Sequence, residues 1–224
     1  MKRFDWGVAV VAGLCFLFAW SAPTLYADQF TMTFKSVGGP NSGGVYTYPY
    51  NFTVTPTGGG SSLDLSLMCI SFDKEIFLQS PPESWKANVE TAGSLGSTYE
   101  EAAYLYTLAK ANPSDGAANW AAWALFESST LSGRDAFLAA HISGSELTQA
   151  ESLLRGLSSI DLANYANYDV FLAVDGTQTP CDPAPQNFIG LITPEPRSLL
   201  LLGTGLLALT AFLYFRRNKT GVSI

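Results

Sequence analysis

Histidine, cysteine and basic residues are all scarce in this chain of 224 residues. It contains one histidine, His141, three cysteines, and twelve lysines and arginines. A serine hydrolase would have a single candidate base, and the chain has no Gly-x-Ser-x-Gly sequence to accompany it. Without a Cys-x-x-Cys pair or a Cys/His cluster, a structural zinc site is not expected. We therefore predict no metal site and no cofactor.

Sequence motifs for nucleotide and metal chemistry are also missing. The chain has no Walker-type loop, no Gly-x-Gly-x-x-Gly fingerprint and no His-Glu-x-x-His pair. An extracellular hydrolase would depend on a carboxylate pair such as Asp73 and Glu75, but such pairs are also common on solvated strand ends. The sequence thus predicts a protein that is not an enzyme, with a hydrolase as the alternative.

Acidic residues outnumber basic ones through the central part of the chain. Residues 28–196 contain six lysines and arginines and eighteen aspartates and glutamates, a net charge of −12. This charge repels phosphate backbones and anionic lipid, so we predict no nucleic-acid partner. Solubility outside the cell is a sufficient reason for the charge.

An apolar run near the N-terminus predicts export. Lys2 and Arg3 precede apolar residues over 7–20, and small and polar residues follow up to Ala27. This order is typical of a secretory signal peptide, which delivers the chain to the Sec translocon. We predict a signal peptide over residues 1–27, cleaved after Ala27. An uncleaved N-terminal anchor is the alternative.

A second apolar run predicts a transmembrane helix near the C-terminus. Residues 198–215 carry no charge. At ~1.5 Å of rise per residue, about 18 residues span roughly 27 Å, close to the hydrocarbon thickness of a bilayer. Arg216 and Arg217 begin a basic tail over residues 216–224, which the positive-inside rule places in the cytoplasm. The preceding domain is then expected across the membrane.

Pro194, Glu195 and Pro196 stand just before this span, in a linker over residues 191–197. Together with the Leu-rich span and the pair Arg216-Arg217, they resemble the PEP-CTERM sorting signal of Gram-negative bacteria. The resemblance implies processing by exosortase, a membrane-embedded cysteine transpeptidase, and an association with exopolysaccharide and biofilm. It implies transient anchoring in the inner membrane, then a place at the cell surface or outside the cell. A plain single-span anchor fits the same residues.

The exported domain, residues 28–190, changes its hydrophobic period along the chain. Alternating apolar and polar residues predict strands over 30–35, 45–55, 63–72, 85–91 and 168–174. Helical spacing predicts two Ala- and aromatic-rich helices over 97–111 and 116–128, followed by helices over 134–142 and 145–158. The order of these elements predicts an α+β domain in which a mainly antiparallel sheet packs against the central helical pair.

Details of this domain follow from shorter patterns. Ser97 with Glu100 and Thr98 with Glu101 predict overlapping capping boxes at the first helix. Asp115 is expected to cap the second helix. The last strand is expected to pair with the N-terminal strands, and residues 182–193 to link the domain to the span.

Cys69 and Cys181 are the cysteines that remain after removal of the signal peptide. Because two thiols of a small exported domain most often pair, we predict a Cys69–Cys181 disulfide. Residues 67–70 (Leu-Met-Cys-Ile) and 119–123 (Asn-Trp-Ala-Ala-Trp) are also similar in layout to thioester domains of bacterial surface adhesins. This resemblance implies a thioester-like bond between Cys69 and Asn119, although Asn119 is one methylene shorter than the glutamine of that family.

Three tyrosines alternate in the predicted strand over 45–55. Tyr46, Tyr48 and Tyr50 would share one face, and we expect this face to pack against the helices. A stacking platform for glycans is the alternative, since aromatic rings combine apolar faces with polar tips. The sequence as a whole predicts a non-enzymatic surface or matrix protein, with exosortase, membrane lipid and exopolysaccharide as partners. An adhesin that binds glycans or uses Cys69 covalently is the alternative function.

Overall fold

The computed structural model describes residues 29–74, 82–177, 179 and 185–192, together with Gly205 and Leu209. The chain divides into two compact units, Met1–Gly190 and Leu191–Ile224. The predicted signal peptide, the span apart from Gly205 and Leu209, and the basic tail lie outside the described residues. Among the residues that are described, no helix has both the length and the apolar character needed to cross a membrane.

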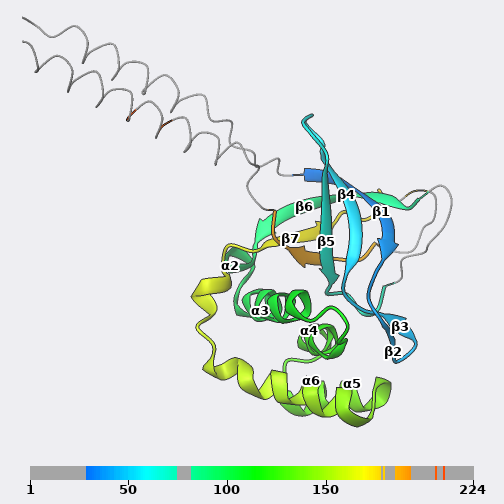
Figure 1. Ribbon diagram of the computed structural model, residues 1–224, viewed down its shortest axis with the longest axis vertical. Coiled ribbons are helices and arrows are strands. Elements are labelled where there is room, and N and C mark those ends of the chain that lie inside the picture. The colour runs from blue at the N-terminus through cyan, green and yellow to red at the C-terminus, as the bar shows by residue number, and fades with distance from the viewer. Residues whose placement is uncertain are drawn as a thin grey trace, which may run out of the picture. The chain divides into compact units, whose positions relative to one another are not determined.

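Six antiparallel strands close into a barrel in the first unit (Figure 1). The strands follow the order β1–β4–β5–β8–β7–β6, and β6 pairs with β1 to complete the circle. Their bounds are β1 Gln29–Val37, β4 Tyr50–Pro56, β5 Leu63–Cys69, β6 Ser84–Thr91, β7 Asp169–Ala173 and β8 Phe188–Gly190; a separate hairpin consists of β2 Asn41–Ser42 and β3 Val45–Tyr46. The predicted α+β class and antiparallel pairing are confirmed, whereas the closure of the sheet was not predicted.

Alternating side chains from these strands fill the barrel. Every second residue from Phe30 to Phe34 is buried, which confirms the period-2 pattern predicted for this segment. Phe52 is fully buried, and its ring centroid lies 4.7 Å from that of Phe188 and 5.6 Å from that of Trp85. Both contacts are edge-to-face, the arrangement that aromatic quadrupoles favour. An aromatic core therefore holds together strands from both ends of the domain.

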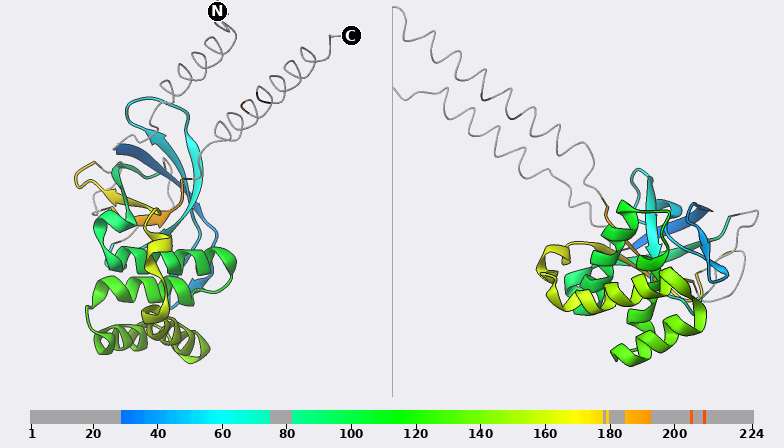
Figure 2. Two further views of the ribbon diagram at one scale, coloured as in Figure 1. Left: turned by 90° about the vertical axis from the view of Figure 1, so that its left-hand side faces the viewer. Right: turned by 60° about the horizontal axis from the view of Figure 1, so that its bottom comes forward.

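The helices form one excursion of the chain between β6 and β7 (Figures 1 and 2). They are α2 Ala92–Leu95, α3 Ser97–Ala111, α4 Ala117–Glu127, α5 Leu131–His141 and α6 Gly144–Gly156, followed by the 3-10 turns η1 Leu157–Ser159 and η2 Leu162–Tyr165. Helices α3 and α4 pack on each other and contact β8 and β5, and α5 and α6 pack on α4. Figure 1 shows α3 and α4 between the barrel and the α5–α6 layer. The predicted central helical pair thus covers one end of the barrel.

The two central helices begin near the predicted positions, but their capping differs. The N-cap of α3 is Gly96, which makes no side-chain capping bond. Ser97 and Thr98 already lie within the helix, so the predicted capping boxes are wrong. At α4, Asp115 Oδ1 accepts the backbone N–H of Ala117 at 3.0 Å. This bond satisfies one of the free N–H groups of the first turn.

For the C-terminal part of the domain, one prediction is confirmed and one is wrong. Strand β7 pairs with β6, one of the strands that precede the helices, as predicted, and also with β8. Residues 182–193, predicted as a link, contain β8, in which Phe188 pairs with Cys69 of β5 and Phe171 of β7. A strand of three residues is too short to show a period in the sequence, because periodicity needs several repeats.

The β2–β3 hairpin is tied to the helices at its turn. Ser42 Oγ accepts the indole N–H of Trp120 at 2.9 Å and donates to Glu146 Oε2 at 2.5 Å. The next residue, Gly43, has a φ of +58°, and a Cβ built on it would lie 2.7 Å from the carbonyl oxygen of His141. Both the backbone conformation and the close approach therefore require glycine at position 43.

Gly43→Ala is expected to destabilise the protein more than Gly44→Ala does. Both glycines have positive φ, but a Cβ at Gly44 meets no atom within 4 Å. Gly44→Ala should therefore cost only the backbone strain of about 1–2 kcal/mol, while Gly43→Ala adds an overpacking cost of about 1–3 kcal/mol. Urea unfolding of the two variants measures the difference, and equal midpoints would show that the hairpin is not held against the helices.

Candidate functional site

The barrel meets the helices at the end of β5, where Cys69 is the last residue of the strand. Its side chain is fully buried, and the thiol donates to the backbone oxygen of Ser71 at 3.4 Å. Burial raises the pKa of the Cys69 thiol to about 12, and the Asp73 carboxylate adds to the rise. The sulfur is therefore protonated at neutral pH and is a poor nucleophile in this state.

Asn119 of α4 is the second buried group at this junction, with 1% of its surface exposed. Its Nδ2 donates to the backbone oxygen of Cys69 at 2.9 Å, and its Oδ1 accepts the backbone N–H of Tyr48 at 2.8 Å. The structure thus brings Cys69 and Asn119 together, as the layout resemblance implied. Both polar atoms of the asparagine bind backbone groups and not the sulfur.

Trp123, one turn further along α4, completes the cluster. Its indole N–H faces the Cys69 sulfur and lowers the pKa of the thiol, against the larger effect of burial. Nε1 has no conventional hydrogen-bond partner in the described part of the chain. The contact with sulfur is therefore looser than a regular hydrogen bond. We call Cys69, Asn119 and Trp123 the junction cluster.

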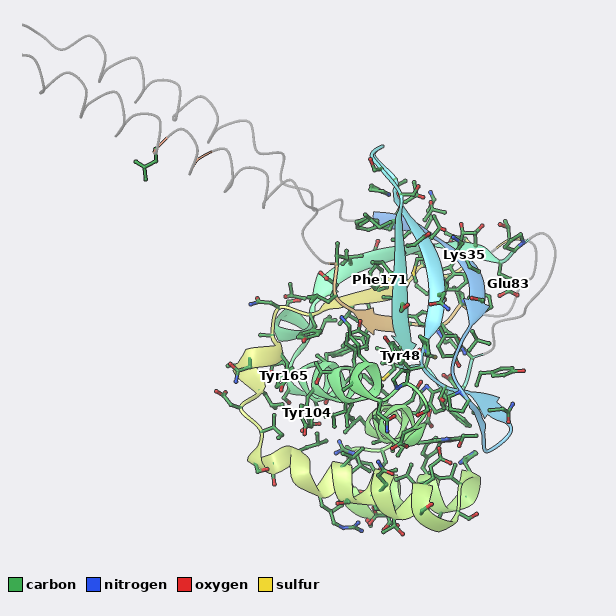
Figure 3. The ribbon with its side chains drawn as sticks, viewed as in Figure 1. Lys35, Tyr48, Glu83, Tyr104, Tyr165 and Phe171 are labelled. Atoms are coloured by element: carbon green, nitrogen blue, oxygen red, sulfur yellow. The ribbon has the colours of Figure 1, made fainter. Side chains whose placement is uncertain are left out.

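The three tyrosines predicted as a glycan platform do not share an exposed face. Strand β3 ends at Tyr46 and β4 begins at Tyr50, so the alternation does not continue through this segment. Tyr48 and Tyr50 are buried, and 47% of Tyr46 is exposed. Figure 3 shows Tyr48 where the barrel meets the helices, and its ring packs edge-to-face on Tyr106. Tyr48 and Tyr50 therefore pack inward, as expected, and the alternative glycan platform is not formed.

His141, the sole candidate base, lies at the exposed end of α5. Its Nδ1–H donates to the backbone oxygen of Phe137 at 2.8 Å, and its ring stacks on Trp120. These contacts are structural. Within the described residues, no group of three His, Cys, Asp or Glu side chains is arranged to hold a metal ion.

Other predicted site residues fall outside the part of the chain that the structure describes. These are Cys181, the motif Pro194-Glu195-Pro196, and the pair Arg216-Arg217. Among the described residues Cys69 has no disulfide partner. Its pairing with Cys181 stays a prediction.

A crevice of about 330 Å³ opens beside the junction cluster. Its polar and aromatic lining comes from four segments: the turn after β5, the start of α3, the end of α4 and the residue before β8. These lining residues are Asp73, Lys74, Tyr99, Phe126, Glu127 and Asn187. Ser71 connects the crevice to the cluster, because its Oγ accepts the backbone N–H of Asn187 at 3.1 Å and its carbonyl accepts the Cys69 thiol.

Sequence reasoning did not find this crevice. Tyr99 and Glu127 lie at opposite ends of two helices, and Asn187 lies in a segment predicted as a link. No short motif joins residues that only the folded chain brings together. Comparison of the chain with known protein families and with curated proteins finds no match.

Cys69 should resist alkylation in the folded protein. With a pKa near 12, the thiolate form of Cys69 at pH 8 is on the order of a thousandfold less populated than that of an ordinary thiol. Full burial also blocks access of the reagent to the sulfur. We expect iodoacetamide to modify Cys69 at least about a hundredfold more slowly in buffer than in denaturant. Peptide mapping identifies the modified residue, and equal rates in the two conditions would contradict the buried thiol.

Proposed function

We propose that the chain is an exported surface or matrix protein whose tail is a PEP-CTERM sorting signal recognised by exosortase. The order of Pro194-Glu195-Pro196, an uncharged apolar segment and Arg216-Arg217 carries this proposal. In this role the protein is held transiently in the inner membrane with its C-terminus in the cytoplasm. It is then passed to the cell surface or released beside envelope exopolysaccharide, and it acts without catalysis.

The extent of the barrel supports the proposed processing. The first strand begins at Gln29, just after the predicted cleavage at Ala27, and the last described strand ends at Gly190, before Pro194. All six barrel strands lie within residues 29–190. Cleavage at both ends would therefore remove none of the strands that close the barrel.

Mature mass and location in cells with and without exosortase test this proposal. A chain shortened at its C-terminus, found outside the inner membrane only when exosortase is present, is the expected result. A triple variant of Pro194, Glu195 and Pro196 to alanine should behave as the wild type does without exosortase. Pro183→Ala, a proline substitution upstream of the motif, is the matched control. An unchanged, full-length tail in both cells would refute the proposal.

A second candidate function is an adhesin that uses Cys69 for a covalent bond. The contact between Asn119 and the backbone of Cys69 favours it, since the two residues of the proposed bond are neighbours. A thioester would lower the intact mass by about 17 Da through loss of ammonia. A disulfide would lower it by about 2 Da. An intact mass equal to that of the unmodified chain would exclude a thioester between Cys69 and Asn119.

A further inference from the structure

Several polar side chains line the crevice beside the junction cluster. Five of their groups form no hydrogen bond or ion pair with another described residue: the carboxylates of Asp73 and Glu127, the ammonium of Lys74, the hydroxyl of Tyr99 and the Nδ2 of Asn187. Elsewhere in the described residues, charged side chains such as Lys35 and Arg155 do form ion pairs. The crevice therefore places several donors and acceptors, unpaired within the described part of the chain, in one small volume.

The mixture of charges in the crevice restricts the ligand. An anion would be repelled by the two carboxylates of Asp73 and Glu127, and the ammonium of Lys74 offsets part of their attraction for a cation. A neutral ligand rich in hydroxyl groups can bind all three charged groups without repulsion. Each hydroxyl both donates and accepts, so it can bind carboxylates, which only accept, and ammonium or amide N–H groups, which only donate.

One wall of the crevice is aromatic. The rings of Tyr99 and Phe126 meet edge-to-face with centroids 5.1 Å apart, and both side chains are half-buried. Partly exposed rings provide an apolar surface for the C–H face of a sugar, while their neighbours bind its hydroxyls. A volume of about 330 Å³ lies at the small end of the range of ligand pockets, about 300–1,000 Å³. It suits a single ring or the end of a chain.

We propose that this crevice binds a neutral saccharide unit, held by Asp73, Lys74 and Glu127 against the ring of Tyr99. This proposal names a ligand for the proposed surface protein and rests on the proposed function, because only an exported domain would meet extracellular polysaccharide. Binding itself is measured on the purified chain and does not depend on sorting. Failure of one proposal can therefore be told from failure of the other.

The test uses the full chain, purified in a zwitterionic detergent because a glycosidic detergent would itself carry sugar. Saturation-transfer NMR is recorded with glucose, galactose, N-acetylglucosamine and cellobiose at millimolar concentration. We expect signal from at least one of them, with affinity reduced about tenfold or more by Asp73→Ala combined with Glu127→Ala, and by Lys74→Ala. Matched controls are Asp175→Ala and Lys86→Ala, at exposed residues outside the crevice lining.

Each other outcome would overturn the proposal. Absence of signal from every sugar would show that the crevice is not a saccharide site. Binding that survives the three crevice substitutions would place the sugar elsewhere. Tighter binding of glucuronate or of propylamine than of the neutral sugars would show that the crevice selects a charged ligand. Thermal unfolding of each variant distinguishes loss of the site from loss of the fold.

Discussion

Asn119→Ala is expected to destabilise the protein by about 3–5 kcal/mol. The substitution leaves the backbone N–H of Tyr48 and the backbone oxygen of Cys69 buried without the partners that Asn119 gives them. Each unsatisfied group costs about 1–3 kcal/mol, and the lost side chain adds a small cavity. A loss of this size is a large share of the ~5–15 kcal/mol that holds a typical domain folded.

Asn164→Ala is the matched control for this effect. Asn164 is exposed in η2, and its Nδ2 donates to Asp161 nearby. Its replacement should change the free energy of unfolding by no more than about 0.5 kcal/mol. Urea unfolding followed by circular dichroism measures both variants. A loss below about 1 kcal/mol for Asn119→Ala would mean that the asparagine does not hold the barrel to the helices.

The protein should lose stability steeply above about pH 9, because it buries several acidic protons. Burial raises the pKa of Cys69 to about 12, and burial is also the main cause of the raised pKa values of Tyr50 and Tyr106. The unfolded chain releases these protons near pH 9–10, while the folded chain retains them. The free energy of unfolding is thus unaffected below that range. Above it, the free energy falls by about 1.4 kcal/mol per pH unit for each such group.

Melting temperatures from pH 7 to pH 11 test this expectation. Cys69→Ala and Tyr50→Phe should each flatten the alkaline slope by about one proton, since each removes one buried acid. Met68→Ala is the control, because Met68 is equally buried beside Cys69 but carries no titratable group. It should lower the melting temperature at all pH values and leave the slope unchanged. A wild-type curve that is flat to pH 11 would contradict the prediction.

Local patterns predicted most elements of the fold. The alternation over Phe30–Phe34 and the Ala-rich segments of α3 and α4 each carry their own periodicity, so their type and approximate bounds follow from the sequence. Closure of the barrel depends on β8, which is only three residues long. Its pairing with β5 and β7 is set by the whole fold and leaves no local pattern.

The candidate site was predicted less completely, for a similar reason. Cys69 and Asn119 were connected through a resemblance in layout, and the structure does place them together. The bonds of Asn119 run to backbone atoms, which no residue pattern reveals. Tyr48 and Tyr50 pack inward as expected, but Tyr46 does not share their face, because β3 ends at Tyr46 and the predicted single strand is interrupted there.

The position of the helices between two paired strands has an evolutionary consequence. Residues 92–168 leave the barrel after β6 and return to it at β7, so they form an insertion between two paired strands. An insertion whose two ends lie on neighbouring strands can lengthen, shorten or diverge without shifting the register of the barrel strands. This tolerance does not extend to Asn119, whose side chain bonds the backbone of Tyr48 and Cys69 in the barrel. Divergence among descendants of this chain should therefore concentrate in α5 and α6 and spare the face that α4 turns to the barrel.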